Sequence, residues 1–248
     1  MSRINGFLGR RNLIKLMGIA GVSAVATTAC NQAKQTSTTQ APASPAAQPV
    51  ANATDKTKEP YVRPFSDDMT PEQALQLLVD GNKRFTDQKL AHPRQDFARL
   101  TETGADQFPF AAFLSCADSR VPVEVVFDQG IGDCFVVRMA GNVATPEGIG
   151  SLEFGTAVLG SKVLVVLGHE GCGAVNAVLR QQKLPAESKI GTLVPYIEPG
   201  VDKAKNKSGN DLMNSVKATT LVQVETLKRS PILAGLIKEN KLKIVGAY

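Results

Sequence analysis

The 248-residue sequence contains no tryptophan and only two histidines, His92 and His169, so few residues could supply the imidazole groups that metal and catalytic sites often use. It also lacks an apolar run of about twenty residues, the length that a helix needs to cross a bilayer. A permanent transmembrane helix is therefore not expected in this chain.

A large excess of one charge is missing from most of the chain. The formal net charge is +5, but residues 1–60 carry all of it, because residues 61–248 contain 21 basic and 21 acidic side chains. A folded domain with balanced charges lacks the net positive charge that is typical of nucleic-acid-binding domains. We therefore expect no nucleic-acid partner.

The first thirty residues have the pattern of an export signal. The segment Gly9-Arg-Arg-Asn-Leu-Ile-Lys15 resembles a twin-arginine signal, and an apolar stretch follows from Leu16 to Ala29. Cys30 stands where bacterial lipoproteins carry their lipidated cysteine; ordinary cleavage after a small residue is the alternative. The leader predicts export to the periplasm or to the outer face of the cytoplasmic membrane, with a lipid anchor through Cys30 if that cysteine is modified.

Residues 31–60 consist mainly of Ala, Pro, Thr, Ser and Gln. Such a segment buries too little apolar surface to offset the entropy lost on ordering, so it predicts a flexible tether. The domain boundaries expected from the sequence are therefore 1–30 for the export signal, 31–60 for the tether and 61–248 for one folded domain.

Within that domain, strands are predicted to alternate with helices. Thr70 and Pro71 mark the start of a helix that continues to about Phe85. The buried strands are predicted at Phe110–Ser115, Cys134–Met139 and Val163–Gly168, and the later helices at Glu147–Leu159, Ala174–Arg180 and Asp211–Leu227. This alternation predicts an α/β fold with a mainly parallel central sheet flanked by helices.

Two predicted strands end in residues that bind metals. Cys116 follows the first strand, His169 follows the third, and Cys172 comes three residues later at the first turn of a helix. Ligands gather at the carboxyl ends of parallel strands, so these side chains are expected at one edge of the sheet. Two cysteines and one histidine with an open fourth position are typical of catalytic zinc. A disulfide between Cys116 and Cys172 is the alternative, whereas Cys134 is interpreted as a buried, inert thiol and His92 as a surface residue.

The segments Cys116-Ala-Asp-Ser-Arg-Val121 and Gly168-His-Glu-Gly-Cys-Gly173 closely resemble the two signature motifs of the β-class carbonic anhydrases. The resemblance runs from about Met69 to the end of the chain. It also covers Leu78–Phe85, Phe135–Asn142, Ser151–Phe154 and Lys243–Tyr248. It implies the β-carbonic anhydrase fold with an N-terminal helical arm, and a homodimer or larger homo-oligomer.

The resemblance implies reversible hydration of carbon dioxide to bicarbonate and a proton by a zinc-bound hydroxide. One Zn²⁺ per subunit would be held by Cys116, His169 and Cys172. Asp118 would accept a hydrogen bond from the hydroxide, and Arg120 would pair with Asp118 and keep it off the metal.

The resemblance also assigns substrate contacts. Gln107 matches a glutamine that donates a hydrogen bond to a substrate or bicarbonate oxygen, and Gly173 belongs to the second motif beside the metal. Phe135 and Phe154 match positions that line the carbon dioxide pocket, with ordinary core packing as the alternative. The branch of the family that closes its site at low pH carries tryptophan where this chain has Phe113, so Phe113 and Gln107 together favour a constitutively open site.

Two other functions stay open at this stage. Relatives hydrolyse carbon disulfide or carbonyl sulfide on the same zinc site, and the chain could instead be a non-catalytic bicarbonate- or zinc-binding module. Asp118, Arg120 and Gln107 argue against the module, because a structural zinc site needs none of them. Relatives also complete a last strand and continue beyond the position of Tyr248, so the sheet is expected to lose an edge if the chain stops there.

Overall fold

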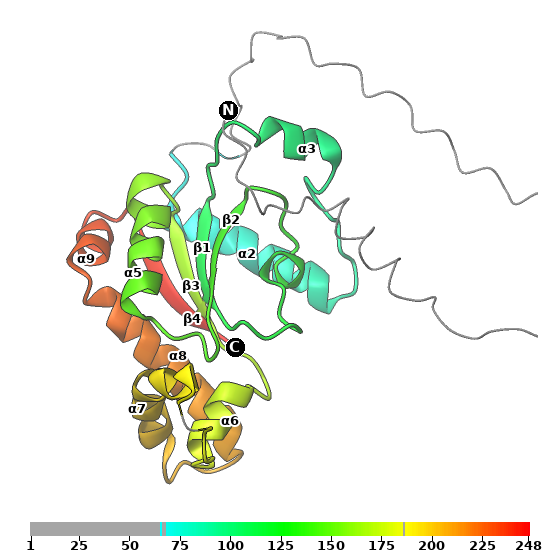
Figure 1. Ribbon diagram of the computed structural model, residues 1–248. Helices are drawn as coiled ribbons and strands as arrows, with labels where there is room; N and C mark the ends of the chain where they lie inside the picture. The colour runs from blue at the N-terminus through cyan, green and yellow to red at the C-terminus, as the bar shows by residue number, and fades with distance from the viewer. Residues whose placement is uncertain (1–64, 66–67, 186) are drawn as a thin grey trace, which may run out of the picture. The chain divides into compact units, whose positions relative to one another are not determined.

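Four parallel strands form the centre of the protein (Figure 1). The computed structural model describes Phe65, residues 68–185 and residues 187–248. The predicted leader and tether, including Cys30, lie outside these residues. The strands are β1 (Ala111–Ser115), β2 (Cys134–Arg138), β3 (Val163–Leu167) and β4 (Lys243–Ala247), and they lie in the order β2-β1-β3-β4.

The helical segments are α2 (Pro71–Thr86), α3 (Phe97–Glu102), α4 (Val123–Val126), α5 (Pro146–Glu153), α6 (Gly173–Leu179), α7 (Val194–Ala204), α8 (Asp211–Lys228) and α9 (Pro231–Lys238). A π-helical segment, η1 (Phe154–Val158), continues α5, and a 3₁₀ segment, η2 (Lys189–Leu193), leads into α7. Among the described residues, none of these helices is long and apolar enough to span a membrane.

Helices cover both faces of the sheet, as the alternating pattern predicted. Side chains from α2 and α4 pack on one face, where Leu78 and Val123 belong to the same buried cluster as Phe113 and Val165. Side chains from α5, α8 and α9 pack on the opposite face, for example Leu152. Strands β1 and β3 are buried along their whole length. Continuous apolar runs without alternation are typical of strands that are covered on both sides.

The helix predicted from Thr70 is α2. The Thr70 side chain accepts a hydrogen bond from the Gln73 amide, and the Gln73 side chain accepts one from the Thr70 amide. This capping box satisfies two amide groups that the first turn leaves without partners. Pro71 occupies the first helical turn, where its missing N–H costs nothing. The N-terminal boundary of α2 was therefore predictable from the sequence.

Two buried carboxylates anchor the segment that joins α2 to α3. Asp128 accepts hydrogen bonds from Arg84 and from the amides of Ala91 and His92. Asp133 accepts them from Arg94. Both carboxylate side chains are fully buried. The connecting segment is thus attached to the loop that precedes β2.

The final strand β4 pairs with β3 over five residues, from Lys243 opposite Val163 to Ala247 opposite Leu167. The strand is formed up to Ala247, the residue before Tyr248. The strand also packs against α8: Ile244 clusters with Val224 and Leu227, and Gly246 leaves room for the Thr220 side chain. Packing on both sides thus supports the last strand.

Candidate metal centre

Three elements bring Cys116, His169 and Cys172 together. Cys116 directly follows β1, His169 lies two residues after the end of β3, and Cys172 is the N-cap residue of α6. Their exposed fractions are 4%, 8% and 0%. Their ligand atoms all lie within 4.8 Å of one another, and within the described part of the chain this is the group whose geometry could hold a metal ion.

The imidazole of His169 presents one nitrogen to the two sulfurs. Its Nδ1 lies 3.0 Å from the carbonyl oxygen of Glu170, a distance that suits donation of an N–H to that oxygen. The other nitrogen, Nε2, is buried and has no hydrogen-bond partner among the described residues. A buried nitrogen that lacks a hydrogen-bond partner and lies close to two cysteine sulfurs is the arrangement expected of a metal ligand whose other nitrogen is held by a carbonyl group.

The pKa values of the two cysteine thiols are shifted in opposite directions. The pKa of Cys116 is lowered to about 4, mainly because the Cys172 thiol donates a hydrogen bond to its sulfur; the nearby His169 ring and the Gly141 amide, which donates at 3.3 Å, lower it further. The pKa of Cys172 is raised because its thiol donates to Cys116 and because it is buried. A divalent cation would favour the thiolate form of both groups. Two soft sulfur ligands and one imidazole are a donor set that suits Zn²⁺.

Asp118 and Arg120 form a fixed pair beside the three ligands. Arg120 Nε donates to Asp118 Oδ1 at 2.9 Å, Arg120 Nη2 donates to Oδ2 at 2.8 Å, and the Arg120 amide donates to Oδ1 at 3.0 Å. These hydrogen bonds hold the pKa of Asp118 well below its usual range. Asp118 Oδ2 is 3.9 Å from His169 Nε2, so the carboxylate lies next to the three ligands without being one of them.

Arg138, at the end of β2, supports the loop that carries Cys116 and Asp118. Its Nε donates to the carbonyl oxygen of Cys116 at 3.1 Å, and its Nη2 donates to that of Asp118 at 2.5 Å. Arg120 Nη2 reaches the carbonyl oxygen of Gly171 at 3.4 Å and so contacts the loop of the second motif. Arginine side chains thus link β2 and both motif loops.

The other predicted site residues lie in different surroundings. Phe135 on β2 and Phe154 on η1 are neighbours, with ring centroids 6.3 Å apart, and Phe154 is 46% exposed. Gly173 begins α6, and a side chain placed there would meet no atom within 4 Å. Gln107 is exposed and precedes the amino end of β1, whereas Cys116 follows its carboxyl end. The structure therefore does not place Gln107 at the metal centre of its own chain.

The residues predicted to lie outside the site do so. His92 is exposed, as expected of a surface residue. Cys134 is half-buried rather than fully buried as predicted; it packs against the cluster that contains Phe113, and desolvation raises the pKa of its thiol well above the usual value. Phe113 is fully buried and packs against Phe127 in a tilted arrangement, with ring centroids 5.1 Å apart.

Sequence reasoning did not assign roles to Gly141 and Asn142, although both lie in a segment that matches the family. Gly141 has a φ of 77° and Asn142 a φ of 44°, a region that non-glycine residues other than asparagine and aspartate rarely adopt. This turn directs the Gly141 amide at the Cys116 sulfur. The Gly141-Asn142 pair could have predicted this turn, because glycine and asparagine are the residues that most readily adopt a positive φ.

Comparisons with known proteins agree with this geometry. The carbonic anhydrase family model matches residues 111–248. Carbonic anhydrase 2 of Mycobacterium tuberculosis (strain ATCC 25618 / H37Rv) is 47% identical over 109 residues, which are 44% of this chain and 53% of that relative. The carbonic anhydrase of Synechococcus elongatus is 28% identical over 190 residues, covering 69% of this chain and 66% of the relative. The chain thus spans about half the length of the mycobacterial protein.

Solved structures share the fold. The β-carbonic anhydrase CcaA matches with a TM-score of 0.54 and 23% identity, covering 70% of this chain and 89% of that one. The Coccomyxa β-carbonic anhydrase in complex with acetazolamide matches with a TM-score of 0.52 and 25% identity, covering 70% and 81%. Tetrameric β-carbonic anhydrases from Sordaria macrospora match with a TM-score of 0.54 and 20% identity, covering 69% and 89%.

Proposed function

The chain belongs to the carbonic anhydrase family, in its β class, and we propose that it catalyses the reversible hydration of carbon dioxide to bicarbonate and a proton with zinc as its cofactor. The observation that carries this proposal is the buried group of Cys116, His169 and Cys172 beside the Asp118–Arg120 pair. A structural zinc site would have a fourth protein ligand, and it would not require an aspartate–arginine pair beside the metal.

Cys116, His169 and Cys172 would hold one zinc ion per subunit. Zinc bound there would lower the pKa of a water molecule enough to make hydroxide available near neutral pH. The described residues supply no fourth side chain to this group. A position for water or substrate therefore accompanies the three ligands.

In this proposal, Asp118 accepts a hydrogen bond from the attacking water or hydroxide. Because Arg120 lowers its pKa, the carboxyl group stays ionised throughout the neutral range and cannot donate a proton there. Both carboxylate oxygens are already bonded to Arg120, which fixes the direction in which their remaining lone pairs point. Asp118 thus orients the attacking oxygen towards carbon dioxide, and Arg120 holds Asp118 in place.

We propose a homo-oligomer, which the tetrameric relatives from Sordaria macrospora support. Gln107 precedes the amino end of β1, a strand that spans about 16 Å at 3.3 Å per residue. If Gln107 binds a substrate or bicarbonate oxygen, it does so in the site of another copy of the chain. Phe135 and Phe154, which face each other at the edge of the sheet, are proposed to supply apolar surface for carbon dioxide.

The proposed location is the periplasm or the outer face of the cytoplasmic membrane, with attachment through a lipid on Cys30 as the alternative to simple cleavage. This part of the proposal rests on the order of basic, apolar and small residues in the leader. Mass spectrometry of the mature protein tests it directly. A lipid mass on an N-terminal Cys30 would show the anchor, and an unprocessed leader would contradict export.

Metal analysis and a stopped-flow hydration assay test the function together. We expect one zinc per subunit, loss of activity on chelation, and recovery when zinc is restored. Asp118→Asn should keep its zinc but lose roughly 10²-fold or more in kcat, because the amide cannot accept the same hydrogen bonds and also donates one. The matched control is Asp202→Asn, which changes an exposed carboxylate on α7 and should leave kcat unaltered.

Three results would contradict the proposal. Zinc-free protein with full activity would exclude the cofactor, and full activity in Asp118→Asn would exclude the role of the carboxylate. Zinc-loaded protein that turns over carbon disulfide or carbonyl sulfide but not carbon dioxide would replace the proposed substrate.

A further inference from the structure

The segment between β2 and α5 carries a hydrogen-bond donor to one of the metal ligands. Residues 139–144 of this segment form what we call the β2–α5 turn, and the Gly141 amide in it donates to the Cys116 sulfur at 3.3 Å. At the start of the turn, the Met139 amide donates to the Ser115 carbonyl oxygen at 2.9 Å. This end of the turn is therefore held by the last residue of β1.

Gln223 on α8 holds the other end of the β2–α5 turn. Its side chain is buried, with 1% exposed. Its Oε1 accepts a hydrogen bond from the Ala144 amide at 2.9 Å, and its Nε2 donates to the Tyr196 carbonyl oxygen of α7 at 2.8 Å. The amide group thus acts as an acceptor towards the turn and as a donor towards α7, and only one orientation of it satisfies both partners. An apolar side chain at this position would leave the buried Ala144 N–H without an acceptor.

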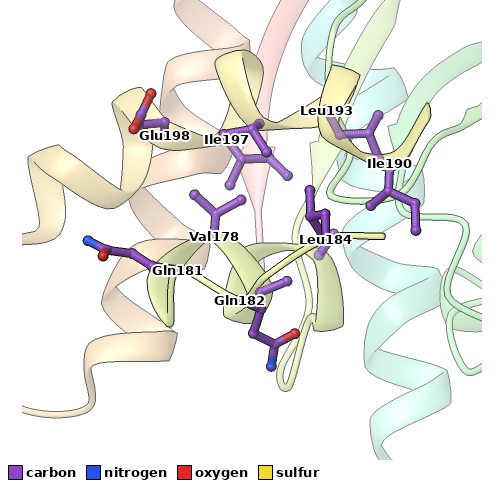
Figure 2. Close-up of a pocket in the computed structure, with 11 residues that line it drawn as sticks. Val178, Gln181, Gln182, Leu184, Ile190, Leu193, Ile197 and Glu198 are labelled. Carbon is purple, nitrogen blue, oxygen red and sulfur yellow. The ribbon is translucent and has the colours of Figure 1, made fainter. Parts of the chain in front are cut away.

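Helix α7 also contacts the turn directly, through the residue that follows Tyr196. The Cδ1 atom of Ile197 lies 2.9 Å from the position that a β-carbon on Gly141 would occupy, and the β-carbon of Ala174 on α6 lies 3.4 Å from it. Figure 2 shows Ile197 pointing from α7 towards Val178 on α6. Gly141, with its φ of 77°, therefore fits against two helices at a place where a larger residue would be crowded.

We propose that Gln223 is a positioning residue for the metal centre. By joining Ala144 to α7, it keeps the β2–α5 turn in the conformation that directs the Gly141 amide at the Cys116 sulfur. The contacts form a closed ring, because α7 supplies both the carbonyl group that Gln223 binds and the side chain that packs on Gly141. This inference rests on the proposed function, since it takes the Cys116 sulfur as a zinc ligand.

The perturbation that tests the role is Gln223→Met, which keeps the length of the side chain and removes its amide. The buried Ala144 N–H then loses its acceptor, and the turn can relax away from Cys116. Groups that hydrogen-bond to metal ligands tune the affinity of the site for its metal. Because Gln223 acts through the turn, we expect zinc affinity to fall roughly tenfold, the lower end of the about 10–100-fold loss seen when a direct partner of a ligand is removed.

A spectroscopic signature comes from the full chain with cobalt(II) in place of zinc, which gives sulfur-to-metal charge-transfer bands. A hydrogen bond to a thiolate sulfur draws electron density away from it, so a sulfur that loses its donor releases electrons to the metal more easily. In Gln223→Met, the charge-transfer bands should therefore move to longer wavelength. Zinc affinity is measured by competition with a chelator, and neither measurement requires turnover.

Two variants separate positioning from general loss of stability. Leu78→Ala opens a cavity in the cluster on the other face of the sheet, so it should destabilise the protein without moving the cobalt bands. Gln223→Glu should restore the bands of the wild type. Burial favours the protonated carboxyl group, which can accept from Ala144 and donate to Tyr196 as the amide does.

Ile197→Val removes the methyl group nearest to Gly141 and should move the bands in the same direction as Gln223→Met, so this milder change tests the ring even if Gln223→Met does not fold. Unshifted bands in either variant, an equal shift in Leu78→Ala, or no recovery in Gln223→Glu would overturn the positioning role. If the wild type hydrates carbon dioxide and the bands never shift, the positioning role alone fails. Shifted bands in a protein without hydration activity would remove the proposed reaction and keep the positioning role.

Discussion

Asp133 offers a sharp test of how the segment between α2 and β1 is held. Its side chain is fully buried and accepts hydrogen bonds from Arg94 Nε and Nη2 and from the Gly130 amide at 2.7 Å. Arg99 Nη2 lies 3.6 Å from the same carboxylate, and only 4% of the Arg99 side chain is exposed. The buried carboxylate thus pairs with two guanidinium groups, of which Arg99 also contacts Glu102 at 3.3 Å.

Asp133→Asn keeps the shape of the side chain but removes its charge. One oxygen becomes an amide NH₂ group, which faces N–H donors and can bond to none of them. Breaking a buried ion pair by removing one partner costs about 3–5 kcal/mol, a large part of the 5–15 kcal/mol that typically stabilises a domain. We therefore expect a loss of about 3–5 kcal/mol in the free energy of unfolding.

The assay is urea unfolding of the zinc-loaded protein, with Asp202→Asn as the matched control. Asp202 pairs with Lys205 at 2.7 Å, but its side chain is 55% exposed, so its replacement should cost less than about 1 kcal/mol. Arg94→Gln in both backgrounds completes a double-mutant cycle and isolates the coupling between the charges. A loss in Asp133→Asn no larger than that in Asp202→Asn would refute the argument that this carboxylate anchors the segment.

Two further predictions concern packing and pH. Gly81→Ala should destabilise the protein by several kcal/mol in thermal unfolding, because the new β-carbon would lie 1.8 Å from the carbonyl oxygen of Phe127. The control Gly150→Ala places its β-carbon in a helix with no atom within 4 Å and should stabilise the protein by about 0.5–1 kcal/mol. Equal effects of the two substitutions would contradict the prediction. Burial by itself raises the pKa of Asp128, but hydrogen bonds from Arg84 and two backbone amides outweigh it and lower the pKa. Its stabilising contribution is therefore complete above the unfolded value near 4 and is lost as the pH falls through the folded value; Asp128→Asn should be less stable at neutral pH and should lose less stability on acidification, and an unchanged pH profile would exclude this role.

The strands and the first helix could be predicted because local signals and the final environment agree. The predicted run Val163–Gly168 differs from β3 by one residue, since a β-branched run without alternation has few other ways to be buried. Helix α7 gave no such signal, because it contains Pro199 and Gly200. Gly200 is required by tertiary packing: a β-carbon there would lie 2.3 Å from Oγ1 of Thr219 on α8. A close contact between two helices leaves no periodic pattern in the sequence from which it could be predicted.

The candidate metal centre likewise contains groups that could be predicted from the sequence and groups that could not. Cysteine and histidine at strand ends could be located by residue type, because these side chains carry the chemistry. The group that donates to the Cys116 sulfur is a backbone amide, which every residue except proline possesses, so residue type could not identify it. What places that amide is the left-handed turn at Gly141, and Ile197 of α7 packs against this turn. The environment of one metal ligand therefore depends on a helix that the sequence pattern did not reveal.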